Sequence, residues 1–107
     1  MNLKDTSLFR QHCYIGGKWL SAASGKTINV SNPATQQNIG TVPSLDGQEV
    51  RDAINSANAA LAGWQAKTAK ERANILRNWF NLMMQHQDDL AVLMTAEQGK
   101  PLAESKG

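Results

Sequence analysis

The stretch TAKERANILRNWFNLMMQH, residues 68–86, carries the clearest structural signal in the chain. Thr68 is followed three residues later by Glu71, the spacing of a capping box, in which two side chains satisfy free amides at a helix start. Apolar residues then form a broad stripe at helical spacing: Ile75, Leu76, Trp79, Phe80, Leu82 and Met83. The pattern predicts a helix that begins at about residue 69, whose stripe is more typical of a core face than of a ligand site.

Apolar residues upstream recur with the same period, between Gly47 and Trp64. They are Val50, Ile54, Ala57, Leu61 and Trp64. Residues at these spacings line one face of a helix. Ser44 or Asp46 can cap its start, because a short side chain with an oxygen accepts hydrogen bonds from the first free amides.

A third helix is expected after residue 87. Asp88 and Asp89 favour its N-terminus, where negative charge is stabilised, and Gly99 provides a stop. Pro101 then suits the opening turn of another helix. Adjacent helical side chains diverge by about 100°, so capping or solvation is favoured over an acid–base pair at Asp88 and Asp89.

The part of the chain before these helices carries strand and turn signals. Gly16 and Gly17 separate two short runs and supply the positive φ angles of a tight hairpin. Asn32 and Pro33 open a turn between a strand around residues 28–30 and another at 39–42, ended by Pro43. The chain is therefore expected to be of the α/β class, with a β-rich segment at about 12–43 and a helical segment at about 44–107.

The composition limits the classes of function that the chain can have. The chain has 107 residues, 41% of them hydrophobic, and a net charge of +2, which suits one small globular unit and not a nucleic-acid partner. Its N-terminus lacks the apolar core of a signal peptide, and no window reaches membrane-spanning length. The lone Cys13 agrees with a reducing compartment. A cytoplasmic protein without membrane or nucleic-acid partners is expected.

Few residues suggest chemistry. Cys13 is the one available thiol nucleophile, but its neighbour His12 points to the opposite face if both lie in a strand, so a structural role is favoured. His12 and His86 lack the ligand spacing of a zinc site. The glycines form no phosphate-binding motif. No catalytic and no cofactor-binding residue is therefore predicted in the chain.

Three segments together resemble the amino-terminal part of the aldehyde dehydrogenase superfamily. They are YIGGKWLSAASGKTINVSNPATQQNIGTVP, then AINSANAALAGWQAKTAKERANILRNWFNLMM, and LAVLMTAEQGKPLAESKG. Within the superfamily, the stretch ERANILRNWFNLMMQHQDDLAVLMTAEQGKPLAE most resembles bacterial succinate-semialdehyde dehydrogenases.

The resemblance implies a parent enzyme that oxidises succinate semialdehyde to succinate with NAD or NADP during 4-aminobutyrate breakdown, as a homo-oligomer. The chain is then expected to be a truncated N-terminal portion, residues 1–107, of the NAD(P)-binding domain. In the family a cysteine thiolate attacks the aldehyde and a glutamate acts as general base. Those groups lie downstream of the residues matched here, and Cys13 does not match the nucleophile, so the chain alone is expected to be inactive and to bind no cofactor.

The resemblance also implies one site within this stretch. Several relatives hold a sodium or potassium ion with carbonyl oxygens before the NP turn and a carboxylate in the E.GKP region. The matching positions are Val30, Ser31 and Glu97. Oxygen ligands suit a hard cation. The alternative, favoured on general grounds, is that Glu97 caps or pairs on the helix surface.

Other functions stay open at this stage. The chain is either a piece of such an enzyme, of this or another aldehyde dehydrogenase subfamily, or a stand-alone module that binds intact dehydrogenase subunits, or a small regulatory protein outside the family. If it is a piece of an enzyme, its apolar helix stripes lack the parent's sheet and are exposed, which favours aggregation or a molten state.

Overall fold

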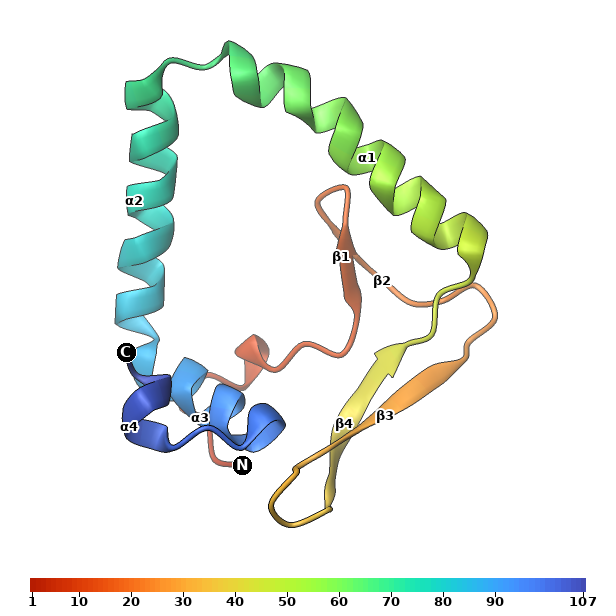
Figure 1. The fold of residues 1–107 in the computed structure, drawn as a ribbon, viewed down its shortest axis with the longest axis vertical. Helices are drawn as coiled ribbons and strands as arrows, with labels where there is room; N and C mark the ends of the chain where they lie inside the picture. Colours follow the sequence, from red (N-terminus) through yellow and green to blue (C-terminus); the bar gives the residue numbers. More distant parts are fainter.

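The structure is a computed structural model that describes all residues 1–107. It holds two separate two-stranded antiparallel sheets, four α-helices and a short 3-10 helix, η1, near the N-terminus (Figure 1). The strands are β1 (Cys13–Ile15), β2 (Lys18–Leu20), β3 (Thr27–Ser31) and β4 (Asn38–Pro43). The helices are η1 (Thr6–Leu8), α1 (Gly47–Ala66), α2 (Ala69–Gln85), α3 (Gln87–Gln98) and α4 (Leu102–Ser105). The predicted α/β class is confirmed, whereas η1 was not predicted.

The hairpin β1–β2 turns at Gly16 and Gly17, as predicted. Their φ angles are 58° and 77°, in the left-handed region that favours glycine. Tyr14 and Trp19 lie opposite each other in the register, with ring centroids 5.0 Å apart. This aromatic pair stabilises the hairpin across its two strands.

The hairpin β3–β4 contains the predicted NP turn. The side chain of Asn32 accepts hydrogen bonds from the amides of Ala34 at 2.9 Å and Thr35 at 3.3 Å, which closes the turn locally. The strand register shifts between Val30 and Ser31 at the end of β3. Such an irregularity redirects the backbone at the point where the strand meets the turn.

Helix boundaries follow the local signals closely. Asp46, and not Ser44, caps α1, and it forms a capping box with Glu49. The capping box of Thr68 and Glu71 at α2 is confirmed. Gly99 ends α3 with φ of 77°. Pro101 is the residue just before α4 and not its first helical residue.

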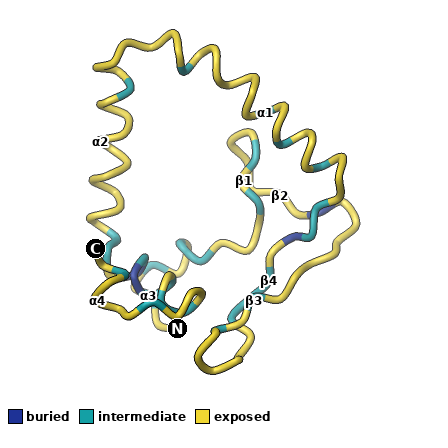
Figure 2. Tube along the Cα trace, viewed as in Figure 1, coloured by how far each residue is buried: buried dark blue, intermediate teal, exposed yellow.

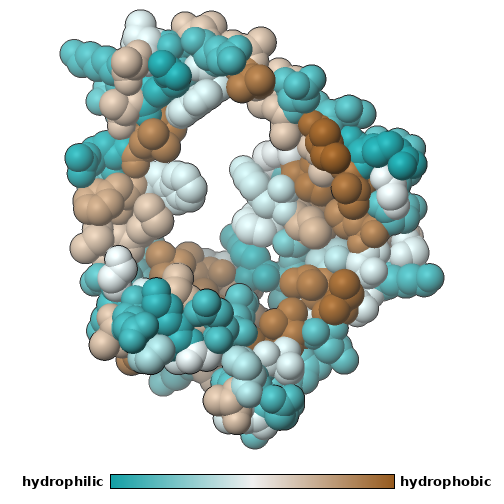
Figure 3. All heavy atoms as spheres, in the orientation of Figure 1, coloured by the Kyte–Doolittle hydropathy of each residue, from teal (hydrophilic) through white to brown (hydrophobic).

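The molecule is an open frame. Helices α1 and α2 form two long sides, the α3–α4 pair closes one corner, hairpin β3–β4 forms the remaining side, and hairpin β1–β2 lies beside α1 at the edge of the opening (Figure 1). The radius of gyration is 16.6 Å, whereas a compact chain of this length has about 13 Å. Figure 3 shows an opening through the centre, with apolar atoms on parts of its rim.

Very little of the chain is buried. The buried residues are Ala22, Pro43, Asp89 and Ala91, and most of the trace is exposed (Figure 2). The accessible surface is 7978 Å², against about 5,900 Å² expected for a folded monomer of 11.7 kDa. The elements are therefore formed by local signals, and the frame lacks a continuous hydrophobic core.

Candidate functional site

Residues of the predicted cation site come from two elements that meet at one corner of the frame. Val30 is half-buried and Ser31 exposed at the bulged end of β3, and Glu97 is exposed near the end of α3. The NP turn lies against the end of α3: a Cβ atom added to Gly99 would come within 3.0 Å of Pro33 Cγ. The fold therefore places the turn beside the helix end that carries Glu97.

A hollow of about 320 Å³ lies beside this contact, between the β3–β4 hairpin and α3, and is lined by Asn32, Thr95 and Ala96 among others. Glu97 makes no hydrogen bond and no ion pair within the chain. Its carboxylate is therefore not committed to another group within residues 1–107.

The nucleophile and zinc candidates gain no partners from the fold. Cys13 is half-buried in β1, where it pairs in register with Leu20. His12 lies just before that strand, and His86 is the residue between α2 and α3. No three His, Cys, Asp or Glu side chains come together as a metal-binding group anywhere in residues 1–107.

Asp88 and Asp89 differ in their surroundings. Asp88 is on the surface, with ion pairs to Lys4 Nζ at 3.1 Å and Lys106 Nζ at 2.9 Å. Hydrogen bonds from Lys106 and Lys4 hold the pKa of Asp88 below its ordinary value. Asp89 is 5% exposed, and its two oxygens accept the backbone amides of Lys4 at 2.9 Å and Asp5 at 2.8 Å.

The expectation of a capping or solvated role is therefore wrong for Asp89. The residue lies in the first turn of α3, but it binds backbone amides more than eighty residues away in the sequence. Nothing in the sequence pattern could have indicated this, because every residue except proline carries such an amide. The fold alone brings the N-terminal segment to α3.

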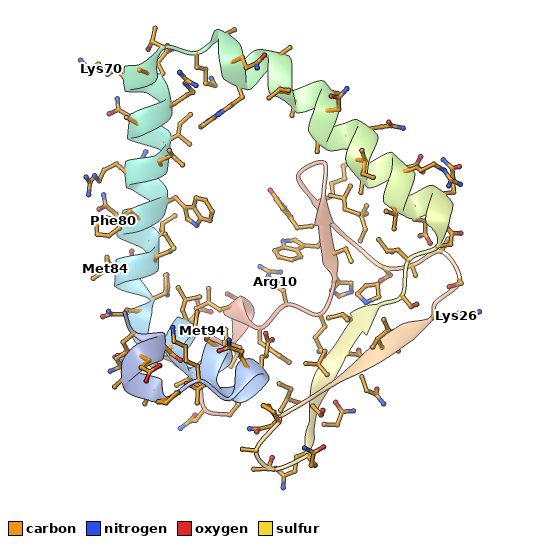
Figure 4. The ribbon with its side chains drawn as sticks, viewed as in Figure 1. Arg10, Lys26, Lys70, Phe80, Met84 and Met94 are labelled. Carbon is orange, nitrogen blue, oxygen red and sulfur yellow. The ribbon has the colours of Figure 1, made fainter.

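The apolar stripe of α2, predicted as a core face, is exposed in this chain. Trp79 is 61% exposed, and Phe80, Leu82 and Met83 are exposed as well. Phe80 lies on the outer side of the frame (Figure 4), where the guanidinium of Arg77 is 5.1 Å from the centre of its ring. Within residues 1–107 the stripe is not a core face, because no other element packs against it.

A second arginine lies over an aromatic ring near the centre of the frame. Arg10, labelled in Figure 4, extends towards the β1–β2 hairpin, and its guanidinium carbon is 4.9 Å from the centre of the Trp19 ring. Such cation–π contacts cover part of an exposed ring and contribute modestly to stability. Neither arginine is arranged with other polar groups as a binding site.

Comparison with known proteins shows which family the chain belongs to. The model of the aldehyde dehydrogenase family matches residues 19–107, which is most of the chain. The chain belongs to the aldehyde dehydrogenase family. A small regulatory protein outside the family is thereby excluded.

Aldehyde dehydrogenases that act on semialdehydes are close relatives over the whole chain. The chain is 62% identical over 107 residues to the succinate-semialdehyde dehydrogenase [NADP(+)] GabD of Escherichia coli K12, covering 100% of this chain and 22% of that protein. It is 60% identical, with the same coverage, to a glutarate-semialdehyde dehydrogenase of Pseudomonas aeruginosa.

The open frame itself matches solved aldehyde dehydrogenase structures. A crystal structure of an E. coli NADP-dependent enzyme superposes with a TM-score of 0.93 and 61% identity, over 99% of this chain and 22% of that one. The chain thus spans about a fifth of the length of its relatives and corresponds to the N-terminal part of the family's structures.

No helix of the structure combines the length and the apolar character needed to cross a membrane. This finding concerns α-helices and agrees with the mixed polar and apolar composition of α1 and α2.

Proposed function

We propose that this chain is the scaffold-forming N-terminal portion of a cytoplasmic, NAD(P)-dependent succinate-semialdehyde dehydrogenase that oxidises succinate semialdehyde to succinate in 4-aminobutyrate breakdown. The observation that carries the proposal is the 62% identity, over the whole chain, to a protein that bears this name. The nearly equal identity to a glutarate-semialdehyde dehydrogenase makes the one-carbon-longer semialdehyde the competing substrate.

The exposed surface supports a scaffold role. The chain exposes about 2,000 Å² more than a folded monomer of its mass, and about 800 Å² per partner is enough for a stable interface. The apolar side chains on α1 and α2 contribute strongly to this excess; among them are Ile54, Leu61, Ile75, Leu76, Trp79 and Leu82. In the parent enzyme these faces pack against the rest of the NAD(P)-binding domain, to which residues 1–107 belong.

The parent's chemistry does not depend on side chains of this stretch. By the resemblance, we expect the catalytic cysteine, the glutamate base and the cofactor-binding groups to lie outside the residues matched here. The parent takes NAD or NADP, with NADP favoured by the name of the E. coli relative, and works as a homo-oligomer. The isolated chain is expected to be inactive and to bind neither cofactor.

A chimera tests this function directly. Residues 1–107 replace the aligned 107 residues of the E. coli succinate-semialdehyde dehydrogenase, and reduction of NADP is measured with succinate semialdehyde and with glutarate semialdehyde. We expect activity close to that of the E. coli enzyme and an unchanged ratio of the rates with the two semialdehydes, because this segment supplies scaffold and the reacting groups come from the E. coli part. The control is the same replacement by the matching segment of the glutarate-semialdehyde dehydrogenase. A soluble, folded chimera without activity contradicts the proposal.

The isolated chain provides a second test. If it is an enzyme portion, its exposed stripes bind a hydrophobic dye and its NMR signals are broad. Sharp, dispersed signals without dye uptake instead indicate a stand-alone module that binds intact dehydrogenase subunits. Enzyme-like NADP reduction by the isolated chain contradicts our placement of the catalytic groups.

A monovalent cation site is part of the proposal. The carbonyl groups of Val30 and Ser31 and the carboxylate of Glu97 supply hard oxygen ligands, which suit Na⁺ or K⁺. Support comes from the position of the NP turn against the end of α3 and from the uncommitted Glu97 carboxylate. The test is the dependence of the chimera's Tm on K⁺ or Na⁺, which Glu97→Gln should abolish and Glu104→Gln, an exposed control on α4, should not. An unchanged salt response in Glu97→Gln removes the site.

A further inference from the structure

The first twelve residues run between two parts of the frame that share few direct contacts. They start beside α3 and pass through η1 towards β1 (Figure 1). We call residues 1–12 the strap. The strap lies outside residues 19–107, which match the family model, so the inference rests on this chain's own contacts and not on the proposed function.

One end of the strap is held by α3. Asp89 is buried, and both of its carboxylate oxygens accept strap amides, from Lys4 and Asp5. Hydrogen bonds to an ionised acceptor are stronger than those between neutral groups. The donors are backbone groups, so the attachment fixes the path of the strap and not merely a side chain.

The strap next forms a short rigid turn. Asp5 caps η1 by accepting the Ser7 amide at 3.0 Å and the Ser7 hydroxyl at 2.6 Å. These hydrogen bonds lower the pKa of Asp5. The turn leads directly from the attachment at α3 to Phe9 and Gln11, so a shift at one end of the strap is transmitted to the other.

The other end of the strap lies on β4. Gln11 Oε1 accepts the Thr41 amide at 2.9 Å. The ring of Phe9 and the same Gln11 oxygen lie so close to Gly40 that a Cβ there would come within 2.7 Å of each. Gly40 is therefore the point where the strap side chains rest on hairpin β3–β4, and a side chain there would force the end of Gln11 and the Phe9 ring to move.

Direct packing between the hairpin and α3 is incomplete, as the hollow of about 320 Å³ between them shows. The contact between the NP turn and Gly99 also joins the hairpin to α3. We propose that the strap sets the position of α3 relative to hairpin β3–β4, with Asp89 and Gly40 as its positioning residues at the two ends.

Amide hydrogen exchange tests this coupling, because Asp89 does not contact Thr41. In the chimera, where the rest of a dehydrogenase surrounds these residues, we expect protected amides at Lys4, Asp5 and Thr41. Asp89→Asn should accelerate exchange at all three, the distant Thr41 included, by about tenfold or more. The capping amide of Glu71 in α2 should be unchanged, which excludes general unfolding.

Asp88→Asn is the matched control. It removes the neighbouring carboxylate, which binds only lysine side chains, and should leave the three amides protected. Faster exchange at Lys4 and Asp5 without a change at Thr41 overturns the proposal, since the attachment is then only local.

Gly40→Ala tests the strap from its other end. Gly40→Ala should accelerate exchange at the Lys4 and Asp5 amides, and unchanged exchange at these two amides overturns the proposal. If Asp89→Asn unfolds the whole chain, Gly40→Ala serves as the test of the coupling in its place. Unprotected Lys4, Asp5 and Thr41 amides in the chimera itself also overturn the proposal.

Discussion

Helices α2 and α3 are neighbours in the chain but acquire their stability differently. Helix α2 has a complete capping box and a broad apolar stripe, yet it contains no buried residue. Helix α3 has no side-chain cap, yet it contains the buried residues Asp89 and Ala91. Strong local signals thus determine that a helix forms, whereas burial depends on whether another element lies against it.

The partners of α3 come from both ends of the chain. The strap binds Asp89, and Ser105 of α4 forms a hydrogen bond of 2.9 Å with Thr95. Helix α2 contacts little beyond the start of α3, and almost all of its trace is exposed (Figure 2). Four substitutions or conditions test this contrast.

The stripe of α2 should show the largest effect, and only where the rest of an enzyme covers it. Trp79→Ala should reduce the free energy of unfolding of the chimera by about 3–5 kcal/mol, the cost of removing a buried Trp. In the isolated chain, where Trp79 is already exposed, the same change should leave the helicity measured by circular dichroism nearly unchanged. Denaturant unfolding of the chimera measures the loss, and a loss under about 0.5 kcal/mol contradicts the proposed covering of α2.

Asp89 should show the next largest effect. Asp89→Ala removes two hydrogen bonds to an ionised acceptor and should cost about 2 kcal/mol in the chimera. Asp88→Ala should change stability little, since the exposed Asp88 contacts only exposed lysine ends. Equal losses for the two variants, read from their denaturation midpoints, contradict the contrast between them.

Thr68 tests the local signal by itself. Thr68→Ala removes the side chain that accepts the Glu71 amide at the start of α2 and should cost about 1 kcal/mol. Ser44→Ala is the control, because Ser44 does not cap α1. Helicity measured by circular dichroism should fall for the first variant only, and an unchanged helicity in Thr68→Ala shows that the cap is dispensable.

Acid should produce the smallest effect. Hydrogen bonds from Thr68 hold the pKa of Glu71 below its ordinary value of 4.5. A lowered pKa in the folded chain means that the contribution is complete above pH 4.5 and is lost as the pH falls below that value. In Glu71→Gln the helicity of α2 should change less with pH in this range. A variant that keeps the full acid response shows that other carboxylates cause it.

The sequence by itself determined the elements and the family. Glycine pairs, the NP turn, capping boxes and apolar periods act within a few residues, so Gly16, Asn32 and Thr68 could be interpreted without a structure, whereas the choice of Asp46 over Ser44 as the cap of α1 could not. Motif order was enough to indicate an aldehyde dehydrogenase, and the family match bears this out.

Only the tertiary structure decided which side chains gained partners. The burial of Asp89 depends on amides at the far end of the chain, and the exposure of Trp79 depends on the lack of a facing element. Backbone donors carry no sequence signature, and a stripe looks the same whether or not something covers it. Long-range contacts are therefore properties of the folded arrangement and not of any local pattern.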